Sequence, residues 1–133
     1  MRCMLDDYFI TDKLSDVNVD FVYRILSTTY WAKKRSHDVI QKSIEHSVCF
    51  SLFKKDQQIG FARLVTDYAT FGYLADVIIE EEYRGRGLGK WLVETIINDE
   101  RWCNIFLLLA TKDAHKLYEK FGFKNSERLM GKI

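Results

Sequence analysis

Proline is absent from this sequence, and cysteine is scarce, with only Cys3, Cys49 and Cys103. The odd number of cysteines and the lack of a CxxC spacing argue against a zinc site and against a disulfide framework. The three histidines show no ligand spacing either, so we expect no metal. We expect reduced thiols in a cytoplasmic protein. Without proline, the breaks between elements must be read from glycine and polar clusters.

Long hydrophobic runs and a strong net charge are also missing. No stretch approaches the roughly 18 apolar residues of a membrane span, and the first residues contain no apolar core of signal-peptide length. The formal net charge is +1, which gives no overall field to attract nucleic acid or anionic lipid. We therefore expect a soluble protein that binds neither nucleic acid nor membranes, in which any anion site is local.

The chain does have enough apolar material for a core. Of its 133 residues, 47% are hydrophobic and 14% are aromatic. No internal repeat, low-complexity tract or Gly/Ser-rich linker divides it. Residues 1–133 are therefore predicted to form one domain.

Hydrophobic periodicity predicts two N-terminal helices. The first is expected over 16–30, after a cap at Ser15 or Asp16. Its apolar residues recur near helical spacing: Val17, Phe21, Ile25 and Leu26. The second helix follows an N-cap at Ser36. The residues expected on its buried face are Val39, Ile40 and Ile44.

Three strands are expected next, and their ranges are Ser47–Phe53, Ile59–Val65 and Phe71–Ile79. The later pattern predicts a helix beginning near Gly87, a strand over Ile105–Ala110, a helix over Ala114–Phe121 and a last strand from Phe123. Residues 71–110 thus form a strand–helix–strand crossover. The class is a mixed α/β domain with helices packed on a sheet.

The most informative segment is the glycine-rich run Arg84-Gly85-Arg86-Gly87-Leu88-Gly89, between an apolar strand and a helix. Alternating glycines permit unusual backbone angles and let the main chain approach a ligand closely. The helix that follows presents unpaired N–H groups and the positive end of its dipole. Arg84, Arg86 and Lys90 add local positive charge. This pattern predicts a phosphate-binding loop.

Other glycine loops fit this segment less well. A P-loop needs Ser or Thr after its lysine, and here Lys90 is followed by Trp91. The dinucleotide fingerprint is GxGxxG, whereas the spacing here is GxGxG. A glycine turn that only caps a helix remains open as the simplest alternative.

Two motifs carry a resemblance to a known family. Arg84-x-x-Gly87-x-Gly89 matches [Q/R]-x-x-G-x-[G/A], and residues 114–123 match A-x-x-L-Y-E-K-x-G-F, with a strand between them. On these motifs the chain resembles the GNAT N-acyltransferase superfamily. The resemblance implies a central, mostly antiparallel twisted sheet with splayed middle strands and helices on both faces. It also implies acetyl-CoA as cosubstrate.

The resemblance places coenzyme A on particular residues. Its pyrophosphate is expected on the backbone amides of Arg84, Gly85, Arg86, Gly87, Leu88, Gly89 and Lys90. Its pantetheine arm is expected beside the main chain of Val77 and Ile79. Thr111 stands where many members of the family have an asparagine, and its hydroxyl can still hydrogen-bond to the cofactor.

The resemblance also implies direct attack by an acceptor amine on the thioester. Tyr118 matches the family's general-acid position, although an aromatic at helical spacing can also be a packing residue. An amine near pKa 10.4 is mostly protonated at pH 7, so a base is needed. Asp76 is the leading candidate, because a carboxyl group inside an apolar strand takes up a proton more readily than an exposed one. Tyr73 and Glu80 are the other candidates. A salt-bridged structural role for Asp76 is left open.

The acceptor is the least determined part. The candidates to line its pocket are Tyr30, Trp31 and Tyr73, and Arg35 or Asp67 could bind a charged group of the acceptor. The alternative is that residues 29–35 are only an ordinary helix end with a solvated basic tail. An edge strand or the C-terminal tail would support a homodimer, and nothing in the sequence decides this. An acetyl-CoA-binding sensor that regulates a partner without turnover is a competing function, and a nucleotide-phosphate binder is a third.

Overall fold

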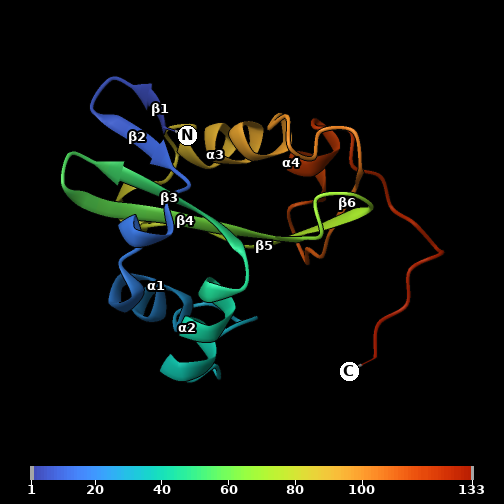
Figure 1. Ribbon diagram of the computed structural model, residues 1–133, viewed down its shortest axis with the longest axis horizontal. Coiled ribbons are helices and arrows are strands. Elements are labelled where there is room, and N and C mark those ends of the chain that lie inside the picture. Colours follow the sequence, from blue (N-terminus) through green and yellow to red (C-terminus); the bar gives the residue numbers. More distant parts are fainter. Residues whose placement is uncertain (1, 133) are drawn as a thin grey trace.

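The computed structural model describes residues 2–132, and a six-stranded sheet forms its centre (Figure 1). The strands lie in the sheet in chain order: β1 Arg2–Leu5, β2 Tyr8–Thr11, β3 Val48–Lys54, β4 Gln57–Thr66, β5 Phe71–Ile79 and β6 Phe106–Leu109. The first five pair antiparallel, and β5 pairs with β6 in parallel. The predicted mixed, mostly antiparallel sheet is confirmed.

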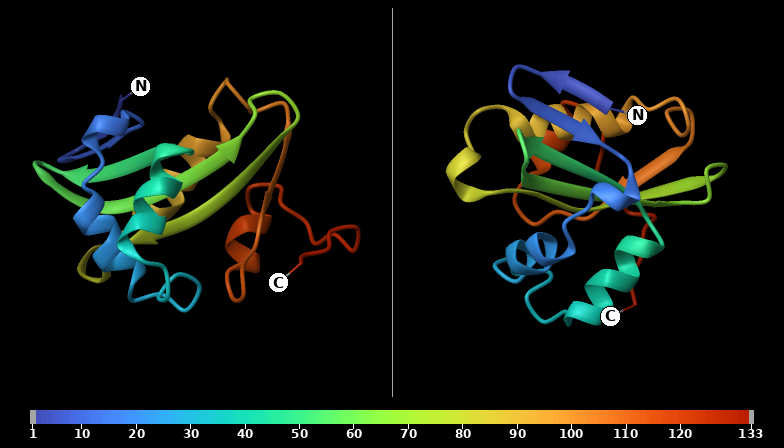
Figure 2. Two further views of the ribbon diagram at one scale, coloured as in Figure 1. Left: turned by 60° about the horizontal axis from the view of Figure 1, so that its bottom comes forward. Right: turned by 60° about the vertical axis from the view of Figure 1, so that its left-hand side comes forward.

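Helices cover both faces of this sheet, also as predicted. The helices of residues 2–132 are α1 Val19–Leu26, α2 His37–Glu45, α3 Leu88–Ile97 and α4 His115–Glu119. Short 3-10 turns, η1 Leu14–Asp16 and η2 Glu81–Tyr83, precede α1 and follow β5. Figure 2 shows α1 and α2 on the opposite side of the sheet from α3. The sheet is therefore a middle layer with apolar side chains on both faces.

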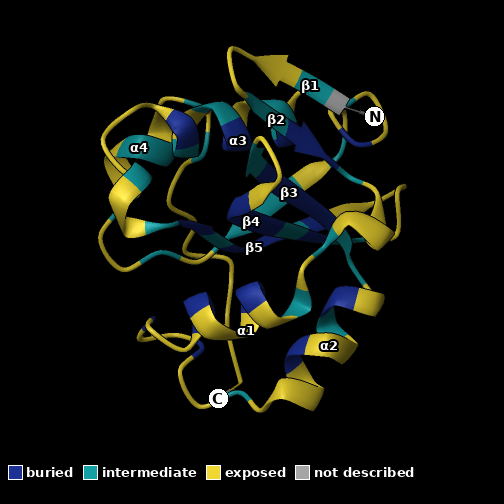
Figure 3. Cartoon of the chain, turned by 90° about the vertical axis from the view of Figure 1, so that its left-hand side faces the viewer, coloured by how far each residue is buried: buried dark blue, intermediate teal, exposed yellow. Residues whose placement is uncertain are grey.

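Each face has its own buried cluster. On one face the α1–α2 side chains, such as Phe21 and Ile44, pack with Phe61 and Ile78 of the sheet. On the other face the residues from α3 are Leu88, Leu92, Val93 and Ile96. The inner strands β3, β4 and β5 are the darkest part of Figure 3. Because each fully buried Leu, Ile or Phe contributes about 1.5–3 kcal/mol, these two layers fix the sheet that carries the site.

The helix starts differ from prediction in one case and agree in the other. Helix α1 is shorter than predicted and is capped by Asn18, whose Oδ1 accepts from the Phe21 N–H at 3.0 Å, rather than by Ser15 or Asp16. Ser36 caps α2 as predicted, accepting from the Val39 N–H at 3.2 Å. Val39 itself is 52% exposed, so its predicted place on the buried face is wrong.

Both ends of the chain also differ from prediction. The β1–β2 hairpin was not predicted, because its strands are only four residues long and turn at Asp6 and Asp7. The last strand expected from Phe123 is not formed. Residues 123–132 have no helix or strand. None of the helices between residues 2 and 132 is both long and apolar enough to cross a bilayer.

The crossover from β5 through α3 to β6 shapes the middle of the sheet. Strand β6 pairs with β5 only from Phe71 to Leu74. Beyond Leu74, β5 continues to Ile79 with β4 on one side, and no strand within the described part of the chain pairs with its other side. This opening is the predicted splay, and it leaves main-chain groups of β5 available to a ligand.

Candidate active site

The free edge of β5 exposes specific main-chain groups. The Glu80 N–H donates to the Ile59 carbonyl at 2.7 Å on the β4 side. Since antiparallel strands alternate the side to which each residue's N–H and C=O point, the groups of Ile79 and Val77 face the open side. The Ile79 carbonyl is engaged there by the Arg84 Nε, which donates to it at 2.8 Å. The structure thus turns the main-chain groups of Val77 and Ile79 toward the opening.

A bulge interrupts the β4–β5 ladder next to this edge. The register shifts between Phe61 and Arg63 of β4, and Asp76 opposite them has a φ of +55°. A left-handed backbone angle is unusual for a non-glycine residue inside a strand and must be held by its surroundings. The bulge sharpens the bend of β5 just before Val77.

The glycine-rich loop lies between the end of β5 and α3. Gly85 and Gly87 have φ of +80° and +78°, and a Cβ at either position would meet nothing within 4 Å. Glycine is therefore required by backbone angle and not by lack of space. Gly87 is the N-cap of α3 and provides no side-chain cap, so the first amides of the helix are open to an anion.

The remaining loop residues divide between anchoring and charge. Leu88 is buried and anchors the start of α3 in the core, and Gly89 packs near Ile79. Lys90 is exposed. Arg86 reaches back to Tyr8, donating from Nη1 to the hydroxyl at 3.3 Å. The loop therefore combines free amides with exposed cations.

Two adjoining hollows, of about 620 and 610 Å³, lie along the open edge of β5. Both are lined by Tyr30, Trp31, Val77 and Asp113. The first extends past Ile79 to Arg84. The second brings together further predicted residues: Arg35, Tyr73, Asp76, Thr111 and Tyr118. The two hollows share four lining residues, so they form one cleft from Arg84, the first residue of the glycine loop, to the predicted catalytic and acceptor residues.

Asp76 is fully engaged at the back of this cleft. Its Oδ2 accepts from the Arg63 Nε at 2.6 Å and from the Arg35 Nη1 at 2.8 Å. Its Oδ1 accepts from the same Arg35 nitrogen and from the Trp31 Nε1, both at 3.0 Å. The structure therefore gives Asp76 the ion-paired role that sequence left open, and not the free carboxylate that a general base needs.

Tyr118, on α4, lines the cleft and is half-buried. Its ring packs edge-on against Phe123, with centroids 6.0 Å apart. Burial raises the pKa of the Tyr118 hydroxyl above its ordinary value. Within residues 2–132 this hydroxyl has no hydrogen-bond partner. It is a protonated phenol that can donate to a ligand in the cleft.

Two other cleft residues are placed by local contacts. Thr111 Oγ1 accepts from the Ala114 N–H at 3.0 Å, which caps the turn before α4 and leaves the hydroxyl proton free to donate. Lys112, next in the chain, lies over the Tyr30 ring at 5.3 Å from its centroid. Tyr73 is half-buried on the wall of the same hollow.

The structure does not bring Asp67 to this cleft. Asp67 lies in the β4–β5 turn, outside both hollows. Its carboxylate accepts from the Thr70 hydroxyl at 2.6 Å and from the backbone N–H groups of Ala69 and Thr70. These hydrogen bonds, that of Thr70 foremost, hold the pKa of Asp67 below its usual range. Its role is to close the turn.

Sequence reasoning missed some residues of the site. Arg63, the strongest partner of Asp76, is a lone cation in an apolar strand, and this is the same signal that singled out Asp76. Lys112 and Asp113 line the cleft but carry no motif signal. No group of three or more metal-ligating side chains occurs among residues 2–132.

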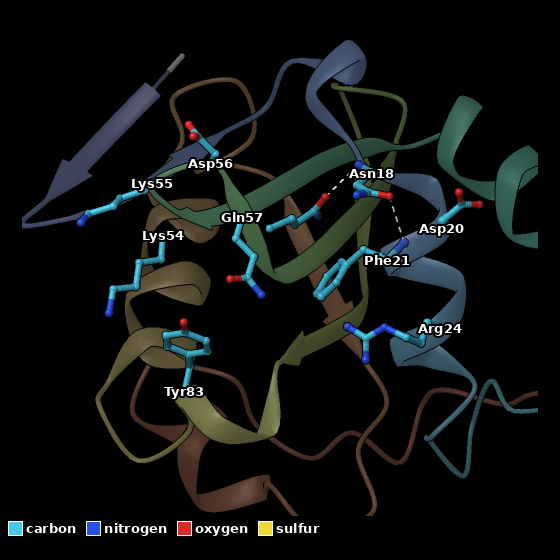
Figure 4. A pocket seen from close by; sticks show the side chains of 10 residues that line it. Asn18, Asp20, Phe21, Arg24, Lys54, Lys55, Asp56, Gln57 and Tyr83 are labelled. Carbon is cyan, nitrogen blue, oxygen red and sulfur yellow. Dashed lines mark hydrogen bonds between the residues drawn. The ribbon is translucent and has the colours of Figure 1, made fainter.

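Another hollow, of about 820 Å³, lies on the α1 side of the β3–β4 turn. Figure 4 shows its wall, with Lys54, Tyr83, Phe21 and Arg24 around it. None of the predicted site residues lines it. We therefore assign the chemistry to the cleft along β5 and not to this wider surface hollow.

Comparison with known proteins agrees with this geometry. Residues 45–125 match the sequence model of the acetyltransferase (GNAT) domain. A solved structure from Xanthomonas campestris pv. campestris, described as an acetyltransferase of the GNAT family, is 36% identical, with a TM-score of 0.91 over 95% of this chain and 92% of that one. A Gibberella zeae protein named as an acetyltransferase is 28% identical over 149 residues, 94% of this chain and 84% of its own.

A more distant structure shares the fold alone. It is a Clostridium acetobutylicum protein solved with acetyl-CoA, 15% identical, with a TM-score of 0.67 over 100% of this chain and 96% of that one.

Proposed function

Because the chain belongs to the GNAT acetyltransferase family, we propose that it transfers the acetyl group of acetyl-CoA to the amine of a small acceptor. The transfer is a direct attack within a ternary complex. The observation that carries the proposal is the cleft that runs from Arg84 along the free edge of β5 to Tyr118, with the uncapped start of α3 following Arg84 in the chain.

The cosubstrate end of the cleft suits coenzyme A. The open amides after Gly87 and the dipole of α3 bind the pyrophosphate, with Arg86 and Lys90 adding positive charge. The main-chain groups of Val77 and Ile79 pair with the amides of the pantetheine arm, as an added strand would. For this the Arg84 side chain releases the Ile79 carbonyl.

Tyr118 donates a hydrogen bond to the departing sulfur. A free tyrosine already holds its proton about 1.5 pKa units more tightly than a thiol, and burial widens that gap. A full early proton transfer is therefore uphill. Tyr118 acts by hydrogen bonding and by late protonation of the thiolate.

The acceptor enters beside Tyr30 and Trp31, where the second hollow opens. A space of about 610 Å³ is suited to a small molecule. Asp76 does not take the acceptor's proton, because its oxygens already accept from Arg35, Arg63 and Trp31. The proton leaves through water in the cleft.

The proposal is tested by turnover. Purified protein is mixed with acetyl-CoA and a panel of small amines, free CoA is measured with a thiol reagent, and acetylated product is identified by mass spectrometry. Release of CoA that depends on one class of amine is the expected result. Tight binding of acetyl-CoA without turnover of any acceptor would contradict it and favour a regulatory sensor.

A further inference from the structure

One buried carboxylate beside the cleft links β5 to two other segments of the chain. Asp76 is 6% exposed and lies at the bulge of β5, immediately before Val77. Its donors come from β4, through Arg63, and from the segment between α1 and α2, through Trp31 and Arg35. The same carboxylate therefore touches both the strand edge and the acceptor wall.

The hydrogen bonds of Asp76 account for its whole accepting capacity. An ionised carboxylate has about four lone-pair positions. Each Asp76 oxygen accepts two bonds: Oδ1 from Trp31 and Arg35, and Oδ2 from Arg35 and Arg63. No position is left to receive a proton from an acceptor or from a water beside it.

The network extends beyond the carboxylate. Arg63 also donates from Nη1 to the Ser47 hydroxyl at 3.1 Å, just before β3. The Trp31 residue is 41% exposed, so its ring faces the cleft while its N–H edge is fixed inward. A left-handed residue inside a strand persists only where its surroundings hold it, and these bonds do so for Asp76.

We propose that Asp76 is a positioning residue, which couples the acceptor wall of Trp31 and Arg35 to the main chain of Val77. The bulge then aims the Val77 amide group at the acetyl thioester, while the wall holds the acceptor in line with it. This rests on the proposed function for the identity of the cosubstrate. Acetyl-CoA and CoA share the pantetheine arm and differ by the acetyl group, so the coupling affects the affinity for acetyl-CoA more than the affinity for CoA.

The test measures the dissociation constants of acetyl-CoA and CoA by calorimetry for matched variants. Trp31→Phe removes the indole N–H and leaves a smaller aromatic ring, and Trp91→Phe makes the same change on α3, away from the cleft. The loss of one hydrogen bond to a charged group lowers acetyl-CoA affinity relative to CoA by about 10-fold in Trp31→Phe. The ratio of the two constants stays at the wild-type value in Trp91→Phe.

A second pair uses charge. Arg35→Ala removes two of the bonds to Asp76, and Lys34→Ala removes an exposed neighbouring cation. The ratio shifts in Arg35→Ala, is partly restored in Arg35→Lys, and is unchanged in Lys34→Ala. A residue that merely stabilised the fold would weaken both ligands equally.

A readout without cosubstrate completes the test. In Trp91→Phe protein the remaining tryptophans are Trp31 and the buried Trp102, so acrylamide quenching reports Trp31. Adding Arg35→Ala raises that quenching, because the wall loses its anchor. Wild-type protein that binds neither ligand would overturn the proposed function. Wild-type protein that binds both, with the ratio unmoved by Trp31→Phe and by Arg35→Ala, would overturn the role of Asp76 alone.

Discussion

Replacing Arg63 by Met tests the buried ion pair at the centre of this account. The change keeps most of the aliphatic stem and removes the guanidinium that lies 2.6 Å from Asp76. The side chains are 13% and 1% exposed, so water cannot replace the lost partner. Removing one member of a buried pair costs about 3–5 kcal/mol. Because Arg35 and Trp31 remain bonded to the carboxylate, we expect about 3 kcal/mol.

The assay is urea unfolding followed by circular dichroism, with Arg24→Met as the matched control. Arg24 pairs with Glu80 at 3.2 Å, but the two side chains are 59% and 21% exposed. Exposed pairs contribute about 0–1 kcal/mol, so this variant should unfold close to wild type. Equal small losses in the two variants would refute the claim that Asp76 depends on burial and on its cationic partners.

Other predictions concern the reaction and the free thiols. Tyr118→Phe should lower kcat by at most about 10²–10⁴-fold while the affinity for acetyl-CoA, measured by calorimetry, stays the same; a drop in affinity alone would mean that Tyr118 only packs. Asp67→Ala should leave the acceptor KM unchanged, since Asp67 closes a turn outside the cleft, and a raised KM would return it to the site. Burial raises the pKa of Cys49 from 9.0 to about 12, so the unfolded thiol ionises first as pH rises. The stability that this thiol contributes is fully present below pH 9 and is lost toward pH 12, by about 1 kcal/mol per pH unit. Urea unfolding at a series of alkaline pH values should show this slope in the difference between the free energies of unfolding of wild type and Cys49→Ala. A difference that does not change with pH would contradict the prediction.

Much of the architecture could be predicted from sequence because its signals are local. The apolar run Phe71–Ile79 is a strand with the predicted bounds, and the glycine loop does precede α3. The Ser36 cap was readable because a hydroxyl before an amphipathic segment satisfies a helix amide within three residues. The β1–β2 hairpin was missed because a four-residue strand has too few alternations to show a period.

The sequence predicts the candidate site only where a motif marks its residues or where the main chain forms it. The alternating glycines mark the loop in the sequence, and Tyr118 is marked by its motif. The partners of Asp76 are not readable in this way, since Trp31, Arg35 and Arg63 lie 45, 41 and 13 residues away. Whether a buried acid is a base or an ion pair is decided by such distant contacts.

The proposed function depends above all on binding of acetyl-CoA by the glycine loop and the free edge of β5. The most direct measurement is calorimetric titration of acetyl-CoA into wild-type protein and into Gly87→Glu. The φ of +78° strains any side chain at Gly87, and open space around it lets a glutamate place negative charge at the start of α3. We expect micromolar binding to wild-type protein and no binding to Gly87→Glu protein that circular dichroism shows to be folded. Folded wild-type protein that binds no acetyl-CoA would contradict the account, and the loop would then be only the cap of a helix.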